Sequence, residues 1–473
     1  MDMADELPKA DLKPSRRAIL NAGVAALASA ATASPFFQQP QQPRPPQDRP
    51  RAVTGPNRST TLDERFTTPV EPANTPMGVG KGIHPGRVVW AHDPKATSWD
   101  GQTGNWWEEA NTDPRALDAM LSGALQSLTG EKTDKRAWSA LFSHFNQTRK
   151  LGRSGYRPGE KIAIKINSNQ DRPGAWRFGA GMPSPHAVYA LVHQLITVAG
   201  VPGQDITLYD ASRYIGDPIL SKIRANPDPN FQAVRCAVSQ RMAGGGRVAA
   251  IADKANPIHF SKQGVRTAYP PNCATEAKYL INQALFRAHT LMGVTLTAKN
   301  HFGSVSFDGA SFTPQPLHDY ASRDLAMGSY NCLVDLIGHK HLGGKTLLYM
   351  VDGLYPAAHN EGRTIRFASF GNHWASSLFL SQDPVAIDSV GLDFLRNEPN
   401  ADECRGKPEN YMHEAALAAK PPSGTVYNPT LDAPLDSLGV HEHWNNATEK
   451  KYSRNLGKRE VIELVAWPKA QKI

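Results

Sequence analysis

The stretch Lys161–Asn167, reading KIAIKIN, decides the fold together with Asp205–Asp210, reading DITLYD. Each is a short apolar run typical of a buried strand. Between them, Pro185 begins an apolar segment that continues to Ala199 and ends at Gly200, a pattern that predicts a helix. Strand, helix and strand in this order form a βαβ unit, so the two strands should be parallel with a right-handed crossover.

Similar patterns continue through the rest of the chain. Apolar runs predict strands at 87–90 and 346–352, and helical periodicity predicts helices at 114–128, 134–149, 277–288, 325–337 and 385–396. From Glu398 onward the sequence is loop-rich. We therefore expect a single large α/β domain at 77–473, with a mostly parallel sheet built from βαβ units and a loop-rich C-terminal extension.

The N-terminus has the features of an export signal. Arg16 and Arg17 precede an Ala-rich stretch, and Ala31–Ala33 offers a small-residue cleavage site. Residues 1–33 therefore resemble a twin-arginine signal, which predicts export of the folded protein to the periplasm by the twin-arginine machinery. Residues 34–76 are rich in Pro and Gln and predict a disordered linker. No other stretch approaches the roughly 20 apolar residues of a membrane span, so no stable span is expected after cleavage.

Charge and cysteine content narrow the class of protein. The net charge of +8 favours anionic partners. No long basic run or basic stripe with interleaved aromatic residues occurs, so nucleic acid is not an expected partner. The four cysteines, Cys236, Cys273, Cys332 and Cys404, lack the short spacing of zinc ribbons and iron–sulfur modules, so no iron–sulfur cluster is expected. Disulfides and buried free thiols both remain open.

Polar residues follow the predicted strands where functional groups of parallel sheets gather. Lys165, Asn167 and Asp210 lie at or near the carboxyl ends of the first two strands. A second group, Lys299, Asn300 and His301, lies near the end of the mainly apolar stretch Leu291–Gly303, LMGVTLTAKNHFG. In our interpretation, the two lysines would hold an anion and the two asparagines would orient it. His301 would be the general acid–base group, and Asp352 with Asp210 would position a metal or that histidine.

Each of these residues also has a structural interpretation. Lys299 could be a surface cation that follows an apolar run, and Asp352 could cap the turn after its strand. Asp383 precedes Pro384 and matches a helix N-cap. Asp388 lies among apolar residues, and a buried acid needs a partner.

Histidine pairs suggest metal ligands. His441 and His443 are two residues apart, which places both side chains on one face of a strand and suits a divalent metal ion. The alternative is a solvated polar tail. His339 and His341 have the same spacing. The sequence HEAAL, beginning at His413, lacks the second histidine of the zinc-protease motif.

Several of these motifs together resemble the domain-of-unknown-function 362 family, over roughly 78–457. They are KIAIKIN, the helix that begins with Pro185, the strand ending at Asp210, TAKNHFG, the strand end Asp352-Gly353, and DPVAIDSVG at 383–391. The resemblance implies an α/β domain and carries no reaction. The βαβ unit followed by Lys and His also looks like the N-terminal part of nickel-dependent lactate racemases, a likeness of fold only.

The functional prediction follows from these residues. We expect an enzyme that performs metal-assisted or acid–base chemistry on a small anionic substrate, with one divalent metal ion, as in a metal-dependent hydrolase or isomerase. The alternatives are a periplasmic ligand-binding protein without turnover and a redox protein.

Overall fold

The computed structural model describes residues 69–401 and 403–469. The predicted signal and the predicted linker up to residue 68 lie outside the described residues. The last part of that linker, 69–76, is described and contacts the C-terminal region: the amide of Asn74 donates to the carbonyl of His443 at 2.9 Å. Strand β1 (Met77–Gly78) then pairs with β12 (Val440–His441). The ordered body therefore begins before Met77.

The central element is a nine-stranded sheet. Eight strands share one direction, and only β11 runs against them, as the pairing of each neighbouring pair shows. The mostly parallel α/β fold is therefore confirmed. In spatial order the strands are β13 (Glu463–Trp467), β2 (Arg87–His92), β11 (Ser377–Ser381), β10 (Thr346–Gly353), β7 (Tyr279–Leu285), β3 (Ile162–Ile166), β4 (Ile206–Asp210), β5 (Arg235–Val238) and β6 (Val248–Ala249).

Two predicted helices differ from the structure. The segment 277–288 is strand β7, between β3 and β10, and all seven of its residues are buried. A strand covered on both faces has no polar alternation, so its continuous apolar pattern does not distinguish it from a buried helix. The helix predicted at 325–337 is shorter, because α8 begins only at Cys332, where the side chain of Asn331 caps it.

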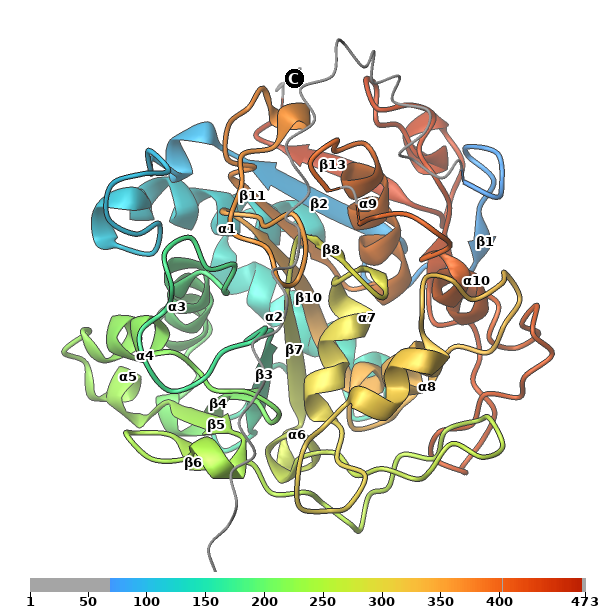
Figure 1. The fold of residues 1–473 in the computed structure, drawn as a ribbon, viewed down its shortest axis with the longest axis horizontal. Coiled ribbons are helices and arrows are strands. Elements are labelled where there is room, and N and C mark those ends of the chain that lie inside the picture. The colour runs from blue at the N-terminus through green and yellow to red at the C-terminus, as the bar shows by residue number, and fades with distance from the viewer. Residues whose placement is uncertain (1–68, 402, 470–473) are drawn as a thin grey trace, which may run out of the picture. The chain divides into compact units, whose positions relative to one another are not determined.

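Helices cover both faces of the sheet, and α3 and α4 lie on the other side of β3 and β7 from α7 and α8 (Figure 1). Aspartate and serine caps followed by proline begin α1, α3 and α9. One layer contains α1 (Pro114–Thr129), α2 (Asp134–Thr148), α3 (Pro185–His193), α4 (Asp217–Arg224) and α5 (Pro229–Ala233). The other contains α6 (Asn272–Glu276), α7 (Thr297–Asn300), α8 (Cys332–Gly338), α9 (Pro384–Arg396) and α10 (Asn410–Ala416).

The chain changes face between two neighbouring strands. After β3 it continues to α3 in one helix layer, and after β7 it passes through the small hairpin of β8 (Ala288–His289) and β9 (Gly293–Val294) to α7 in the other. Such a switch leaves a crevice at the carboxyl ends of the two strands, where ligands bind in open α/β sheets.

Two further observations concern the described ranges as a whole. All four cysteines are unpaired; Cys236, Cys332 and Cys404 are buried, and Cys273 is partly buried. Within 69–401 and 403–469, no helix combines the length and the apolar character that crossing a bilayer requires.

Candidate functional site

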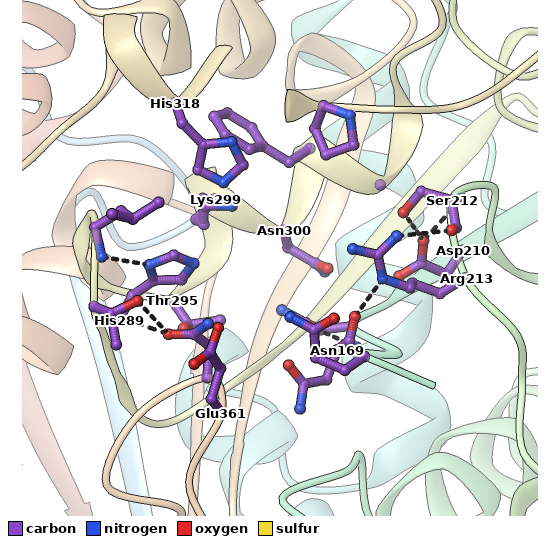
Figure 2. Close-up of a pocket in the computed structure, with 18 of the residues that line it drawn as sticks. Asn169, Asp210, Ser212, Arg213, His289, Thr295, Lys299, Asn300, His318 and Glu361 are labelled. Atoms are coloured by element: carbon purple, nitrogen blue, oxygen red, sulfur yellow. Dashed lines mark hydrogen bonds between the residues drawn. The ribbon is translucent and has the colours of Figure 1, made fainter. Parts of the chain in front are cut away.

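A polar pocket of about 290 Å³ occupies the crevice beyond β3 and β7. Its walls come from the loops after β3 and β4, the β8–β9 hairpin and α7 (Figure 2). Polar and charged side chains dominate this lining: Asn167, Asn169, Gln170, Asp210, Ser212, Arg213, Arg287, His289, Thr290, Thr295, Lys299, Asn300, Gln315, His318, Asn360 and Glu361.

Three cations of this pocket form no ion pair with a carboxylate in the described part of the chain. Arg213 donates to the carbonyls of Asn169 (2.7 Å) and Ser212 (3.0 Å), and Arg287 donates to the carbonyl of Gly181 (2.8 Å). The ammonium of Lys299 lies 3.8 Å from the ring centre of Phe302. Arg287 is only 1% exposed, and its Nε has no hydrogen-bond partner. Asp210 is paired with Lys165, so these three cations outnumber the remaining carboxylate of the lining, Glu361, and the pocket carries an excess of positive charge.

Burial changes the proton affinities of these groups. It lowers the pKa of Arg287 to about 9, which still leaves the guanidinium charged at neutral pH. Burial, with the nearby charges of Arg213, Lys165 and Arg287, lowers the pKa of Lys299 to about 7. An anion in the pocket would favour the charged form of Lys299 and reverse this shift.

The floor of the pocket is a closed polar network. The ammonium of Lys165 donates to Asp210 Oδ2 (3.1 Å), Asn300 Oδ1 (3.0 Å) and the carbonyl of Ile166 (2.6 Å). The side-chain amide of Asn300 donates to the carbonyls of Lys165 and Gln283 and to Asn282 Oδ1. It therefore joins α7 to β3 and β7. Because Lys165 is fully buried, its charge depends on Asp210.

A residue of α9 holds the short helix α7 in place. Both oxygens of Asp388 accept hydrogen bonds at the start of α7: Oδ1 from the amide and hydroxyl of Thr297 (2.8 and 2.7 Å) and Oδ2 from the amide of Ala298 (2.9 Å). Oδ2 also accepts from the hydroxyl of Tyr411 at 2.9 Å. These are the partners that a buried Asp388 requires, and they place Lys299 and Asn300 at the pocket.

Two histidines line the pocket beside Lys299, opposite Arg213 (Figure 2). His289 Nδ1 accepts from the amides of Leu291 (3.1 Å) and Met292 (3.3 Å), so the proton of the neutral ring is on Nε2. His318 Nδ1 lies 3.2 Å from the carbonyl of Gln315, which places its proton on Nδ1 and leaves Nε2 as a base.

Both rings are neutral at ordinary pH. Burial, with the charge of Lys299, lowers the pKa of His318 to about 4, and the same two causes hold the pKa of His289 well below its usual range. Their ring centres are 6.2 Å apart. The pocket thus offers one neutral base and one neutral proton donor side by side.

The residues predicted from the sequence divide into two groups. Asn167, Asp210, Lys299 and Asn300 line the pocket, and Lys165 lies beneath it. His301 and Asp352 are not among the lining residues. His301 is fully buried and its Nε2 accepts from Asn282 at 3.1 Å. Asp352 accepts from the amides of Ser184 (2.8 Å) and Leu354 (3.2 Å), as a cap at the end of β10 would.

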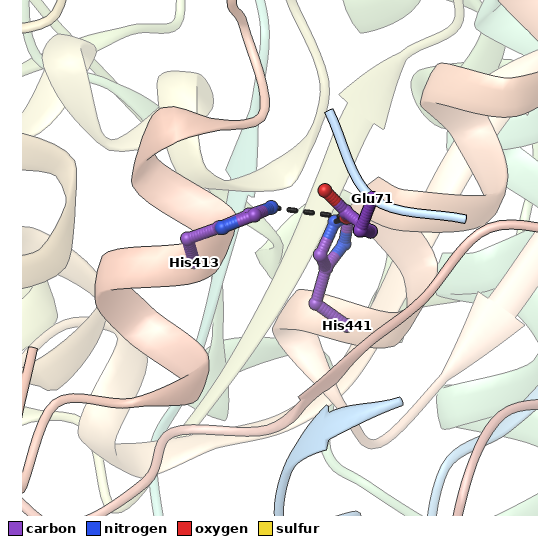
Figure 3. A group of neighbouring side chains, drawn as sticks. All are labelled: Glu71, His413 and His441. Carbon is purple, nitrogen blue, oxygen red and sulfur yellow. Dashed lines mark hydrogen bonds and ion pairs between the residues drawn. The ribbon is translucent and has the colours of Figure 1, made fainter. Parts of the chain in front are cut away.

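A second group of chemically distinctive side chains lies elsewhere. His413 of α10 and His441 of β12 lie against the carboxylate of Glu71 (Figure 3), and His443 also contacts it. Glu71 Oε1 lies 3.0 Å, 2.6 Å and 3.3 Å from the Nε2 atoms of these three histidines in that order. We call these four residues the His–Glu cluster. The potential ligand atoms of Glu71, His413 and His441 all lie within 4.8 Å of one another, a spacing that could hold a metal ion.

The carboxylate and histidines of the cluster influence one another. Burial would raise the pKa of Glu71, but hydrogen bonds from the three histidines hold it far below its usual range. Burial lowers the pKa of His441 to about 4. Burial would also lower that of His443, but the neighbouring Asp393 carboxylate raises it to about 9. The cluster is therefore a buried carboxylate among imidazoles of unlike basicity.

Sequence reasoning missed several residues of the two sites. Arg287 lies near the end of the segment predicted as a helix and His289 just beyond it, where no strand end is expected. Glu71 falls in the predicted linker, and His413 belongs to a sequence that lacks the second histidine of a familiar motif. His318 lies in an irregular loop region, and nothing in its local sequence points to the pocket.

Fold and pocket together define an α/β protein with a cationic site at the carboxyl edge of a parallel sheet. Residues 162–393 match the family model described as "Domain of unknown function (DUF362)". This match supports the family resemblance found in the sequence. No curated protein matches the chain.

Proposed function

We propose that the protein is an enzyme that binds a small anionic substrate in the polar pocket and transfers a proton within it. The observation that carries the proposal is the convergence of Arg213, Arg287 and Lys299 without carboxylate partners. A buried cation without a counter-charge is costly, and an anionic ligand would offset that cost. Guanidinium groups also match the planar geometry of carboxylates and phosphates.

The proton-transfer step rests on the two histidines. His318 Nε2 would accept a proton from the bound substrate, and His289 Nε2–H would donate one. Asn167 and Asn300 would orient the substrate, as predicted from the sequence, while Lys299 would hold its charge. His301 would act indirectly, since it contacts Asn282, which in turn accepts from Asn300. This chemistry suits an isomerase better than a metal-dependent hydrolase.

The space beside the pocket bears on the substrate's size. A larger cavity of about 710 Å³ shares Asn169, Gln170, Asn360 and Glu361 with the polar pocket. Its other lining residues include Arg172, Arg177, Trp176, Phe178 and Arg363. A substrate whose anionic end occupies the inner pocket could therefore place an aromatic or second anionic part in the outer cavity.

Anion binding provides the first test. Titration calorimetry with sulfate and with a panel of small carboxylates should detect binding to the wild-type protein. Arg287→Met should weaken it by about 100-fold or more, since truncating one partner of a buried charge pair costs about 2–5 kcal/mol. Arg241→Met, which changes an exposed arginine outside the pocket, is the matched control. Equal affinities for all three proteins would contradict the proposal.

Turnover separates this proposal from its rivals. The wild-type protein should exchange hydrogen of a bound carboxylate for deuterium from D₂O, as measured by NMR. The rate of this exchange should fall by about 100- to 10,000-fold in His318→Gln. Tight binding without exchange or any other turnover would instead support a periplasmic binding protein. A flavin or redox-active metal in the purified protein would support the redox alternative.

Export is the second part of the proposal. The support is the sequence around Arg16 and Arg17, which lies outside the described residues. Replacing both with Lys should keep the precursor in the cytoplasm, because the paired arginines are the targeting signal. Cell fractionation would show this, and a periplasmic double variant would contradict it.

A further inference from the structure

The His–Glu cluster joins three parts of the chain. Glu71 precedes the first strand, His413 lies on α10, and His441 and His443 belong to the C-terminal region. In Figure 3 the imidazoles of His413 and His441 approach the Glu71 carboxylate from different directions. His441 and Glu71 are buried or nearly so, with side chains 0% and 9% exposed. None of the four residues lines the polar pocket.

The outer nitrogens of two histidines are already engaged. Ser389 Oγ lies 2.7 Å from His441 Nδ1 and 2.7 Å from the carbonyl of Val385. Asp393 Oδ1 accepts from His443 Nδ1 at 2.5 Å. The Nε2 atoms of these two rings point at the Glu71 carboxylate, 2.6 Å from Oε1 for His441 and 3.3 Å for His443. A metal ion that displaces the Nε2 protons would be held by the same nitrogen atoms and the same carboxylate.

This arrangement matches the surroundings of bound metals. A ligating histidine commonly donates its other ring N–H to a carboxylate or another acceptor, which fixes the ring and makes it a better ligand. Two buried atoms at the centre also lack hydrogen-bond partners, Glu71 Oε2 and His443 Nε2. An entering ion would use these two atoms and displace the proton of His443 Nε2.

The distances fit a small four-coordinate ion. With metal–ligand bonds of about 2.0–2.2 Å, neighbouring ligand atoms of a tetrahedral site lie about 3.3–3.6 Å apart. The three distances from Glu71 Oε1 to the Nε2 atoms span 2.6–3.3 Å. Lengthening these three distances by less than about 1 Å would bring them to the tetrahedral spacing. A surface cavity of about 480 Å³, lined by Glu71, His443 and Asp393 among others, gives it a path of entry.

We propose that Glu71, His413, His441 and His443 bind one divalent transition-metal ion of the zinc class. Three imidazoles and one carboxylate are ligands that Zn²⁺ prefers. Because the protein supplies all four ligands, no position remains for a substrate, and the site is structural. The metal fastens the segment around Glu71 to α10 and to the C-terminal region. This site is independent of the anion pocket.

Metal titration of the full-length protein tests the proposal. After treatment with a chelator, the protein should take up one Zn²⁺ per chain, measured by elemental analysis, and its melting temperature should rise. Co²⁺ in place of zinc should give the strong visible absorption of a tetrahedral site. No uptake, or uptake without any change in melting temperature, would overturn the proposal.

Variants locate the ion. Glu71→Gln and His413→Gln should each lower zinc affinity by about 100-fold or more, since even outer-shell changes cost about 10- to 100-fold. His373→Gln, which changes an exposed histidine, should bind zinc as the wild type does. If a variant fails to fold, the Co²⁺ spectrum of the wild-type protein still tests for a tetrahedral site, and an octahedral spectrum would overturn the proposal. Unchanged stoichiometry and affinity in both cluster variants would place the metal elsewhere. Sulfate binding should be unaffected throughout, so failure here and failure of the pocket proposal are distinguishable.

Discussion

The polar pocket and the His–Glu cluster assemble similar side chains in opposite ways. In the pocket, Arg213, Arg287 and Lys299 have no carboxylate partner among the described residues, and a larger cavity shares part of the pocket's lining. In the cluster, one buried carboxylate is surrounded by three imidazoles whose outer nitrogens are partly fixed by Ser389 and Asp393. An excess of unpaired charge beside open space suits a ligand that exchanges. A compact ligand set with fixed orientation suits an ion that stays.

The largest expected effect concerns the buried ion pair of Lys165 and Asp210 at the floor of the pocket. Lys165→Met should lower the free energy of unfolding by about 3–5 kcal/mol, because it leaves Asp210 as an uncompensated buried charge. Denaturant unfolding followed by circular dichroism measures this. The control is Lys161→Met, at the residue just before β3. The ion pair of Lys161 with Glu276 is exposed and should contribute under about 1 kcal/mol. Similar losses in both variants would mean that the floor of the pocket is not a buried pair.

The next effect concerns the zinc affinity of the His–Glu cluster. Asp393→Asn should weaken zinc binding by about 10- to 100-fold, because the amide cannot hold the His443 ring as the carboxylate does. Competition with a metal indicator measures the affinity. Sulfate binding in the pocket should remain at its wild-type value, and a parallel loss would show that the two sites are not separate.

A smaller effect should appear in the pH dependence of anion binding. The pKa of Lys299 in the empty pocket is about 7, so raising the pH through this value removes its positive charge. Sulfate keeps its charge over this range, and its affinity should therefore fall by up to about tenfold per pH unit above pH 7. Calorimetry between pH 6 and about pH 9 measures the slope. In Lys299→Met the profile should be flatter, and a persistent slope would assign the titration to another group.

The last expected effect is that of Lys299→Met on stability. The pKa of Lys299 falls from 10.5 to about 7 on folding, so between these values the unfolded chain binds more protons and the folded state gains stability as pH rises. Methionine removes this penalty near neutral pH. The melting temperature of the variant should accordingly equal or exceed that of the wild type, while Lys165→Met loses stability. A large drop would mean that Lys299 supports packing.

Much of the fold could be predicted from the sequence, because KIAIKIN and DITLYD have the continuous apolar pattern of parallel strands and the intervening Pro185 marks a helix start. The same pattern misled at 277–288, since YLINQAL has no alternation and contains residues that also favour helices. What decides its conformation is pairing with β3 and β10, which lie far away in sequence.

The candidate site was predictable to the extent that strand ends meet at one edge. Asn167, Asp210, Lys299 and Asn300 line the pocket for this reason. The direction in which a side chain points is not encoded locally, and His301, one residue beyond Asn300, is turned into the core. Likewise, His441 and His443 suggested a metal, but Glu71 and His413 join them only through the packing of α10 and the early segment. The sequence spacing of these residues does not predict that contact.

The pairing of β11 has a consequence for anyone who wishes to isolate the family-matched region. Residues 162–393 include β11 but neither β2 nor β13, which continue the sheet on that side. A fragment cut at these limits would present the backbone of Ser377–Ser381 as a bare edge, with the apolar residues that α1 normally covers left in water. Unprotected edges of this kind pair with other chains. The excised segment should therefore form insoluble aggregates, and the smallest soluble unit has to include the strands from both ends of the described chain.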